Sequence, residues 1–132
     1  MVRRVLALSL VAVAAAACSQ AAAAPAVRTV PIRIHYSAFS LSHLDVVPGQ
    51  TVRFVVTNTD PIDHEFIVGD EAVQVAHELG TEAYHPPRPG EITIRAGETV
   101  ATTYTFGDRD LLFGCHLPGH YAYGMRGTIS VS

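Results

Sequence analysis

The sequence predicts an all-β fold, a Greek-key β-sandwich of about eight strands with one short inserted helix. From residue 27 onward, short runs rich in β-branched and aromatic residues alternate with Gly, Pro and Asp, which is typical of strands joined by tight turns. The chain has 132 residues, 48% of them apolar, which is enough for one domain with a two-layer core that needs no disulfide bonds.

The predicted strands begin after turn signals or polar loops. Pro48-Gly49 and Ala96-Gly97 are turn dipeptides, and each precedes a run that alternates in polarity or is rich in β-branched residues. With the other runs of this kind, the pattern predicts antiparallel strands at residues 29–36, 44–47, 51–58, 65–68, 91–95, 99–106, 110–114 and 127–131.

The periodicity changes once, between the fourth and fifth strands. Apolar residues recur at helical spacing from 70 to 80, acidic residues stand in the first turn, and Gly80 is a stop signal, so we expect a short helix. The Pro-rich segment 84–90 fits neither a helix nor a central strand and predicts an extended surface loop. This insertion would lie on one flank of the sandwich.

The N-terminus has the features of an export signal. Arg3 and Arg4 precede an unbroken stretch of apolar or small residues at 5–17, which is too short to span a bilayer. The sequence therefore predicts a signal peptide at 1–17, an Ala-rich tether at 18–26 and a folded domain at 27–132. The expected location is the periplasm or the outer cell surface.

The role of Cys18 has two open interpretations. Residues 15–19 resemble the lipobox of bacterial lipoproteins, in which the cysteine becomes the lipidated first residue of the mature chain, although Ala15 replaces the usual Leu. Lipidation would anchor the domain to a membrane. The alternative is ordinary cleavage within the Ala-rich run. Arg3-Arg4 also offers a weak match to a twin-arginine signal.

A metal-ligating pattern lies just before the last predicted strand. Cys115, His120 and Met125 are separated by four residues in each interval. A trigonal His₂Cys set with a long axial Met is the arrangement that holds redox-active copper, because sulfur suits Cu(I) and imidazole suits both oxidation states. His64, at the start of another strand, is the candidate for the second imidazole. With Cys18 in the leader, a bound metal would also protect the otherwise unpaired thiol.

The pattern resembles that of the cupredoxins, the blue (type 1) copper proteins such as plastocyanin and azurin, over residues 27–132. In that family an isolated His precedes a Cys, His and Met cluster, and His64, Cys115, His120 and Met125 match it one for one. The spacing in the cluster is more similar to that of rusticyanin and auracyanin. The resemblance implies one type 1 copper per chain, held by these four residues, in a protein that carries single electrons and is not an enzyme.

The resemblance also implies transient docking of redox partner proteins near His120, with Leu117, Pro118 and Tyr121 as an apolar rim, by a monomeric protein. The chain contains no lysine, and loss of the leader leaves seven Arg against twelve acidic residues, a net charge near −5. That charge disfavours nucleic acid and anionic lipid and suits a positively charged partner. The alternative function is copper buffering or delivery in the envelope without a redox partner, which would use the same ligands.

Glu65 and His116 depart from the pattern of plastocyanin and azurin, where Asn and Ser or Thr follow the first His and the Cys and join the two loops by a hydrogen bond. In this chain a charge-assisted pair of the two side chains is one expectation. Exposure of both to solvent is the other.

Four further histidines lie outside the predicted ligand set, namely His35, His43, His77 and His85. We expect them to face solvent or to be hydrogen-bonded at the surface. The open alternative is a second, weak metal site formed by His77 and His85, near Glu78 and Glu82.

Overall fold

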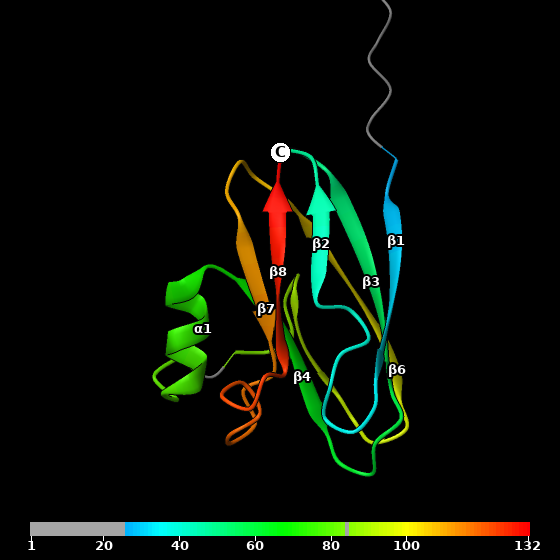
Figure 1. The fold of residues 1–132 in the computed structure, drawn as a ribbon, viewed down its shortest axis with the longest axis vertical. Coiled ribbons are helices and arrows are strands. Elements are labelled where there is room, and N and C mark those ends of the chain that lie inside the picture. The colour runs from blue at the N-terminus through cyan, green and yellow to red at the C-terminus, as the bar shows by residue number, and fades with distance from the viewer. Residues whose placement is uncertain (1–25, 84) are drawn as a thin grey trace, which may run out of the picture.

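The structure is a computed structural model and describes residues 26–83 and 85–132. Two sheets pack face to face, with one helix on their flank (Figure 1). The smaller sheet has the strand order β1 (Arg28–Ile34), β3 (Thr51–Asn58) and β6 (Thr99–Thr105). The larger has the order β2 (His43–Val46), β8 (Arg126–Val131), β7 (Leu111–Gly114), β4 (His64–Gly69) and β5 (Glu91–Ile94). The predicted signal peptide and most of the tether, with Arg3, Arg4 and Cys18, lie outside the described residues.

The predicted sandwich is confirmed, whereas its purely antiparallel character is wrong. All eight predicted strands are present, with small shifts at their ends. However, β1 pairs with β3 and β2 pairs with β8 in parallel. The chain passes from one sheet to the other between β1 and β3, so no hairpin fixes their relative direction. Tyr36, predicted to end the first strand, lies beyond it with φ of +51°.

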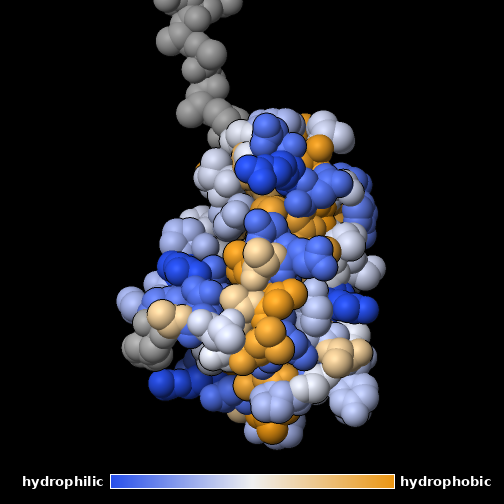
Figure 2. Space-filling model, turned by 90° about the vertical axis from the view of Figure 1, so that its left-hand side faces the viewer, coloured by the Kyte–Doolittle hydropathy of each residue, from blue (hydrophilic) through white to orange (hydrophobic). Residues whose placement is uncertain are grey.

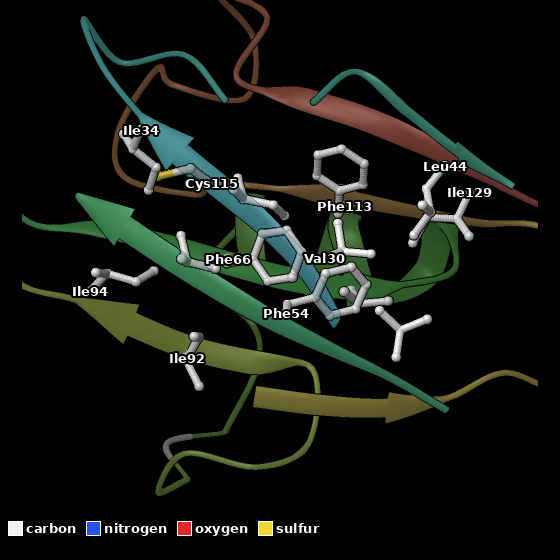
Figure 3. Close-up of a cluster of buried hydrophobic side chains, with 14 of the residues drawn as sticks. Val30, Ile34, Leu44, Phe54, Phe66, Ile92, Ile94, Phe113, Cys115 and Ile129 are labelled. Carbon is white, nitrogen blue, oxygen red and sulfur yellow. The ribbon is translucent and has the colours of Figure 1, made fainter. Parts of the chain in front are cut away.

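The core lies between the two sheets, because inward residues alternate with outward ones along each strand, as in β1 and β3. Three aromatic rings form its centre: Phe54 lies 5.0 Å from Phe66, and Phe66 lies 5.5 Å from Phe113, between ring centroids (Figure 3). Cys115 is fully buried in the same cluster. Replacing a buried Phe by Ala costs roughly 3–5 kcal/mol, so this core holds Cys115 in a stable frame.

The helix α1 (Glu71–Glu78) covers part of the larger sheet at β4 and β7. Asp70 caps its first turn by accepting a hydrogen bond from the Val73 amide at 3.0 Å, and Gly80 follows its end with φ of +63°. The predicted helix and its position on the flank are thus confirmed. No helix in the described part of the chain is long and apolar enough to cross a membrane.

Three segments that carry predicted site residues meet at one end of the sandwich. The start of β4, the end of β7 and the loop before β8 lie at the lower end in Figure 1. The start of β1 and the C-terminus lie at the opposite end. The site is therefore built from loops that the two sheets hold in place.

Candidate metal centre

The structure brings three of the four predicted ligands together around one point. Ligand atoms of His64, Cys115 and His120 all lie within 4.8 Å of one another. Cys115 Sγ is 3.8 Å from His64 Nδ1 and 3.6 Å from His120 Nδ1. His64 is the first residue of β4, Cys115 follows β7, and His120 lies in the loop before β8. The first two are fully buried, whereas His120 is half-buried.

The distances between these atoms fit a trigonal metal ion. Metal–sulfur and metal–nitrogen bonds of about 2.3 Å and about 2.0 Å, 120° apart, place sulfur and nitrogen about 3.7 Å from each other. The observed sulfur–nitrogen distances are 3.6 Å and 3.8 Å. One thiolate and two imidazoles are also the donor set that suits copper in both oxidation states. The residues present therefore fit a copper ion.

A buried carboxylate sets the orientation of the His64 ring. His64 Nε2 is 2.9 Å from Asp60 Oδ2, so the proton on Nε2 is donated to the carboxylate and the lone pair of Nδ1 points toward Cys115. Burial lowers the pKa of His64, and this effect outweighs the opposing influence of Asp60. The imidazole is therefore held neutral, in the tautomer that a metal ion requires.

Asp60 is itself fixed by the loop after β1. Its two carboxylate oxygens accept hydrogen bonds from the backbone amides of Tyr36 at 2.7 Å and Ser37 at 2.8 Å. Burial alone would raise the pKa of Asp60, but these amides, together with His64, hold it below its usual value. Both amide donors have φ of +51°, a conformation that costs non-glycine residues roughly 1–2 kcal/mol each. The charged hydrogen bonds to Asp60 offset that cost.

The Cys115 side chain is buried and lies close to backbone amides. Burial raises the pKa of its thiol, while the backbone amides of Glu65 and Leu117 act in the opposite direction. The Glu65 amide lies 3.3 Å from Sγ, across the gap between β4 and the loop after β7. A metal ion would displace the thiol proton and stabilise the thiolate at this position.

The loop from Cys115 to Met125 folds back on itself through backbone hydrogen bonds. The Met125 amide donates to the His120 carbonyl at 2.9 Å, and the Cys115 amide donates to the Met125 carbonyl at 3.1 Å. Gly119 and Gly124 have φ of +84° and +102°, which other residues rarely adopt. These hydrogen bonds hold the backbone of Met125 beside that of Cys115, and the Met125 side chain is buried. Its role as the axial ligand stays a prediction.

Both expectations for Glu65 and His116 are wrong: the two side chains do not pair, and the His116 side chain is only 2% exposed. Glu65 Oε2 accepts a hydrogen bond from the backbone amide of His116 at 3.3 Å, so the carboxylate does tie the two loops together. The His116 ring instead turns to α1, where Nδ1 is 3.0 Å from Glu78 Oε2 and Nε2 is 2.8 Å from Gln74 Oε1. The Tyr121 ring stacks on one face of the His116 ring, with 4.6 Å between the ring centroids. Helix packing has decided the direction of the ring.

Sequence reasoning missed the partners that orient the histidines. Asp60 precedes His64 by four residues, but in a loop that spacing gives no information about contact. Gln74 is buried and also donates from its amide nitrogen to the carbonyls of Ile67 at 3.2 Å and Gly69 at 3.4 Å, which anchors α1 to β4. Only the helical register of Gln74 hinted that it faces the sheet.

The remaining histidines divide into two groups. His35 and His43 are exposed and hydrogen-bonded to Thr59 at 3.0 Å and Thr128 at 2.7 Å, as expected for surface histidines. His77 and His85 instead come together with a third residue, Glu91, at the start of β5. The sequence placed Glu78 and Glu82 near the two histidines, and Glu91 was missed.

The sequence of this chain is similar to those of known copper proteins. The model of the family described as copper binding proteins, plastocyanin/azurin family, matches residues 29–132. The chain is 33% identical to the "Copper-resistant cuproprotein CopI" of Rubrivivax gelatinosus, over 83% of this chain and 69% of that protein. It is 34% identical to the protein of the same name in Vibrio cholerae, over 65% of this chain, and spans about half of that relative, 53%.

A solved structure shows the same fold. Auracyanin A, a "blue" copper protein from Chloroflexus aurantiacus, superposes with a TM-score of 0.62 at 28% identity, over 79% of this chain and 98% of auracyanin A. The resemblance to cupredoxins is thereby confirmed. The chain belongs to the plastocyanin/azurin family of copper-binding proteins, and copper is its metal.

Proposed function

We propose that the chain is an exported protein that carries single electrons at a type 1 copper site, with His64, Cys115 and His120 as equatorial ligands and Met125 as the axial ligand. When bound there, copper supplies the one-electron Cu(II)/Cu(I) couple. The supporting observation is that the three equatorial atoms already stand at trigonal distances, 3.6 Å and 3.8 Å from sulfur to nitrogen. A site fixed in advance changes little between oxidation states, which favours electron transfer.

Rigidity of the two buried ligands supports this proposal. His64 is held by Asp60, and Cys115 is enclosed by the core, both without exposed surface. A metal ion behind such walls would exchange slowly with solvent or with chelators. Slow exchange suits a resident redox centre better than a carrier that must release its metal.

The half-buried His120 is the proposed route for electrons, and its surroundings suit brief docking of a redox protein. Pro118 is exposed next to it in the loop, and Tyr123 is 93% exposed. Figure 2 shows hydrophobic residues in a broken band that runs down this face and reaches the lower end of the molecule, the end that carries the ligand loop. An apolar rim around a ligand edge supports short contacts with a partner that is then released.

We further propose that residues 18–26 tether the domain, with Cys18 as a lipid anchor. The start of β1 lies at the end of the sandwich opposite to the ligand loop, so a tether there would leave the metal end facing away from the membrane (Figure 1). Membrane fractionation tests this: the full-length protein should sediment with membranes and Cys18→Ala should be released. A soluble wild-type protein would contradict the anchor.

Copper resistance is the second candidate function, because two relatives carry the name copper-resistant cuproprotein. A protein that buffers or delivers copper would use the same ligands without a redox partner. It would also need to exchange the ion on the timescale of copper stress. Exchange rate therefore separates the two candidates.

The experiment combines voltammetry with chelator competition on the protein loaded with one copper per chain. An electron carrier should show a reversible one-electron wave and an intense visible thiolate-to-copper band, and should lose its Cu(I) to a strong chelator only over hours. His43→Ala, at an exposed site on β2, is the control and should match the wild type. Transfer of the ion within seconds, or an irreversible wave, would favour buffering and contradict the carrier.

A further inference from the structure

We propose that His77, His85 and Glu91 form a second metal site, separate from the copper centre, which binds a divalent transition-metal ion with Cu²⁺ preferred. Ligand atoms of the three residues lie within 4.8 Å of one another. Glu91 Oε2 is 3.5 Å from His77 Nε2 and 3.1 Å from His85 Nε2. The residues come from α1, the loop after it and the start of β5, so tertiary packing has assembled them.

In both histidines a backbone carbonyl selects the tautomer of the neutral ring, the one that leaves Nε2 free. His77 Nδ1 is 2.9 Å from the Val73 carbonyl, and His85 Nδ1 is 2.9 Å from the Pro86 carbonyl. A carbonyl only accepts, so each Nδ1 must carry the proton. Each Nε2 of a neutral ring then carries a free lone pair, 3.5 Å (His77) and 3.1 Å (His85) from Glu91 Oε2. Metal-binding histidines are oriented in this way, with the second nitrogen donating to a carbonyl or carboxylate.

The carboxylate at the centre of the cluster lacks a hydrogen bond. Glu91 has a side chain only 8% exposed, and its Oε2 is the one buried side-chain oxygen or nitrogen in the described part of the chain without a hydrogen-bond partner. The two Nε2 atoms are near it but not in hydrogen-bonding directions. A carboxylate oxygen and two unprotonated imidazole nitrogens at these distances repel one another unless a cation lies among them.

The other oxygen of Glu91 is already fixed, which leaves Oε2 available. Arg88 is 2.9 Å from Glu91 Oε1 and also 2.9 Å from Glu82 Oε1. Backbone hydrogen bonds between Arg88 and Glu91 hold the two residues side by side. The carboxylate therefore cannot turn away from the histidines without losing these contacts.

The cluster opens into a groove that gives an ion access and room for water ligands. The groove is lined by the three proposed ligands and by Glu65, Glu82 and His116, among others. The Glu65 carboxylate at its wall adds a negative charge that attracts a cation, whereas Glu82 is paired with Arg88. A site of three protein ligands with an open side resembles the sites at which metals keep exchangeable water.

The donor set indicates which ion the site prefers. Two imidazole nitrogens and one carboxylate oxygen offer no sulfur, so Cu(I) is disfavoured and divalent ions are favoured, Cu²⁺ before Zn²⁺. Bonds of about 2.0–2.1 Å place two donor atoms about 2.9 Å apart at the right angles that Cu²⁺ favours, and about 3.3 Å apart in the tetrahedral arrangement of Zn²⁺. The observed nitrogen–oxygen distances are 3.1 Å and 3.5 Å, so a shift of a few tenths of an ångström reaches either geometry.

The test measures binding of a second ion. Protein first loaded with one copper per chain is dialysed against Cu²⁺ or Zn²⁺, and the bound metal is counted. We expect a second ion in the wild type, and an affinity for it at least about tenfold weaker in both His85→Ala and Glu91→Gln. His43→Ala should match the wild type. In every variant the visible band of the first site should be unchanged, which would show that this site and the fold are intact.

Two results would overturn the proposal: a wild type that takes up only one ion, or His85→Ala and Glu91→Gln variants that bind the second ion as tightly as the wild type. Side-chain nitrogen resonances give an independent readout that needs no variant. Zn²⁺ should shift Nε2 of both His77 and His85, and leave His43 unchanged. Cys115→Ser should still bind at this second site, so its failure and that of the copper centre are distinguishable.

Discussion

The two ligand clusters of this protein use the same residue type in opposite ways. At the copper centre, His64 gives Nε2 to the Asp60 carboxylate and turns Nδ1 to the site. In the proposed second site, His77 gives Nδ1 to the Val73 carbonyl and turns Nε2 to Glu91. The group that accepts the proton decides which nitrogen remains free. A histidine is therefore prepared for metal by its hydrogen-bond partner, more than by its place in the sequence.

Donor softness and burial also differ between the clusters. Cys115 brings a sulfur ligand into the hydrophobic core, whereas His77, His85 and Glu91 offer nitrogen and oxygen at the wall of an open groove. The first set suits a buried ion that changes oxidation state, and the second suits an exchangeable divalent ion. His116 lies between them, because its ring is 5.6 Å from that of His77 and it follows Cys115 in the chain.

The largest expected effect comes from removing the sulfur. Cys115→Ser should abolish the intense visible thiolate-to-copper band, because a hydroxyl cannot replace the thiolate in that transition. Absorption spectra of the copper-treated variant check this, and metal counting should show that the ion held by His77, His85 and Glu91 remains. A variant that keeps its colour would show that Cys115 does not bind the metal.

The next largest effect should come from removing the hydrogen-bond partner of His64, which should weaken metal binding at the copper centre alone. In Asp60→Asn one carboxylate oxygen becomes an amide nitrogen, so either the Tyr36 amide loses its acceptor, or His64 Nε2 and the Ser37 amide both lose theirs. We expect copper affinity at the first site to fall about 10–100-fold, as is typical for such partners. Chelator competition measures it, and affinity at the second site should stay constant. Equal affinity in the variant and the wild type would mean that Asp60 does not orient His64.

Met125→Leu should act only on the copper centre and should retain the ion. Loss of a weak axial donor destabilises Cu(II) relative to Cu(I), so the reduction potential should rise. A tenfold change in the ratio of the two affinities corresponds to about 59 mV for one electron, and we expect a rise of that order by voltammetry. An unchanged potential would show that Met125 does not reach the metal, and complete loss of copper would show a structural role.

The smallest effect concerns the metal-free protein in acid. Burial lowers the pKa of His64 below its ordinary value of 6.5, so the unfolded chain binds more protons in that window and stability should fall as the pH drops below 6.5. The lowered pKa of Asp60 adds a second loss below 3.8, which Asp60→Asn should remove. Each group contributes at most about 1.4 kcal/mol per pH unit. Urea midpoints measured against pH check this, and a midpoint independent of pH below 6.5 would contradict it.

The sequence by itself determined the positions of the strands, the helix and the ligand loop. Their signals are local: alternation along a strand, the acidic first turn and Gly80 stop of α1, and the regular spacing of Cys115, His120 and Met125. Such patterns involve residues close together in the chain, and the repeat of a strand or a helix places those residues on one face of the element. His64 stands out because it begins a predicted strand and because it matches the isolated His of the family pattern.

Only the tertiary structure decided which side chains meet and how they turn. His116 lies 38 positions after Glu78 and Cys115 lies 51 after His64, so no local pattern encodes those contacts. The parallel pairing of β1 with β3 likewise follows from the path of the chain between sheets. The directions of the histidine rings, their hydrogen-bond partners and the unpaired Oε2 of Glu91 depend on how α1 and the loops pack on the sandwich. This packing brings together residues that are distant in the sequence, so no local pattern could predict it.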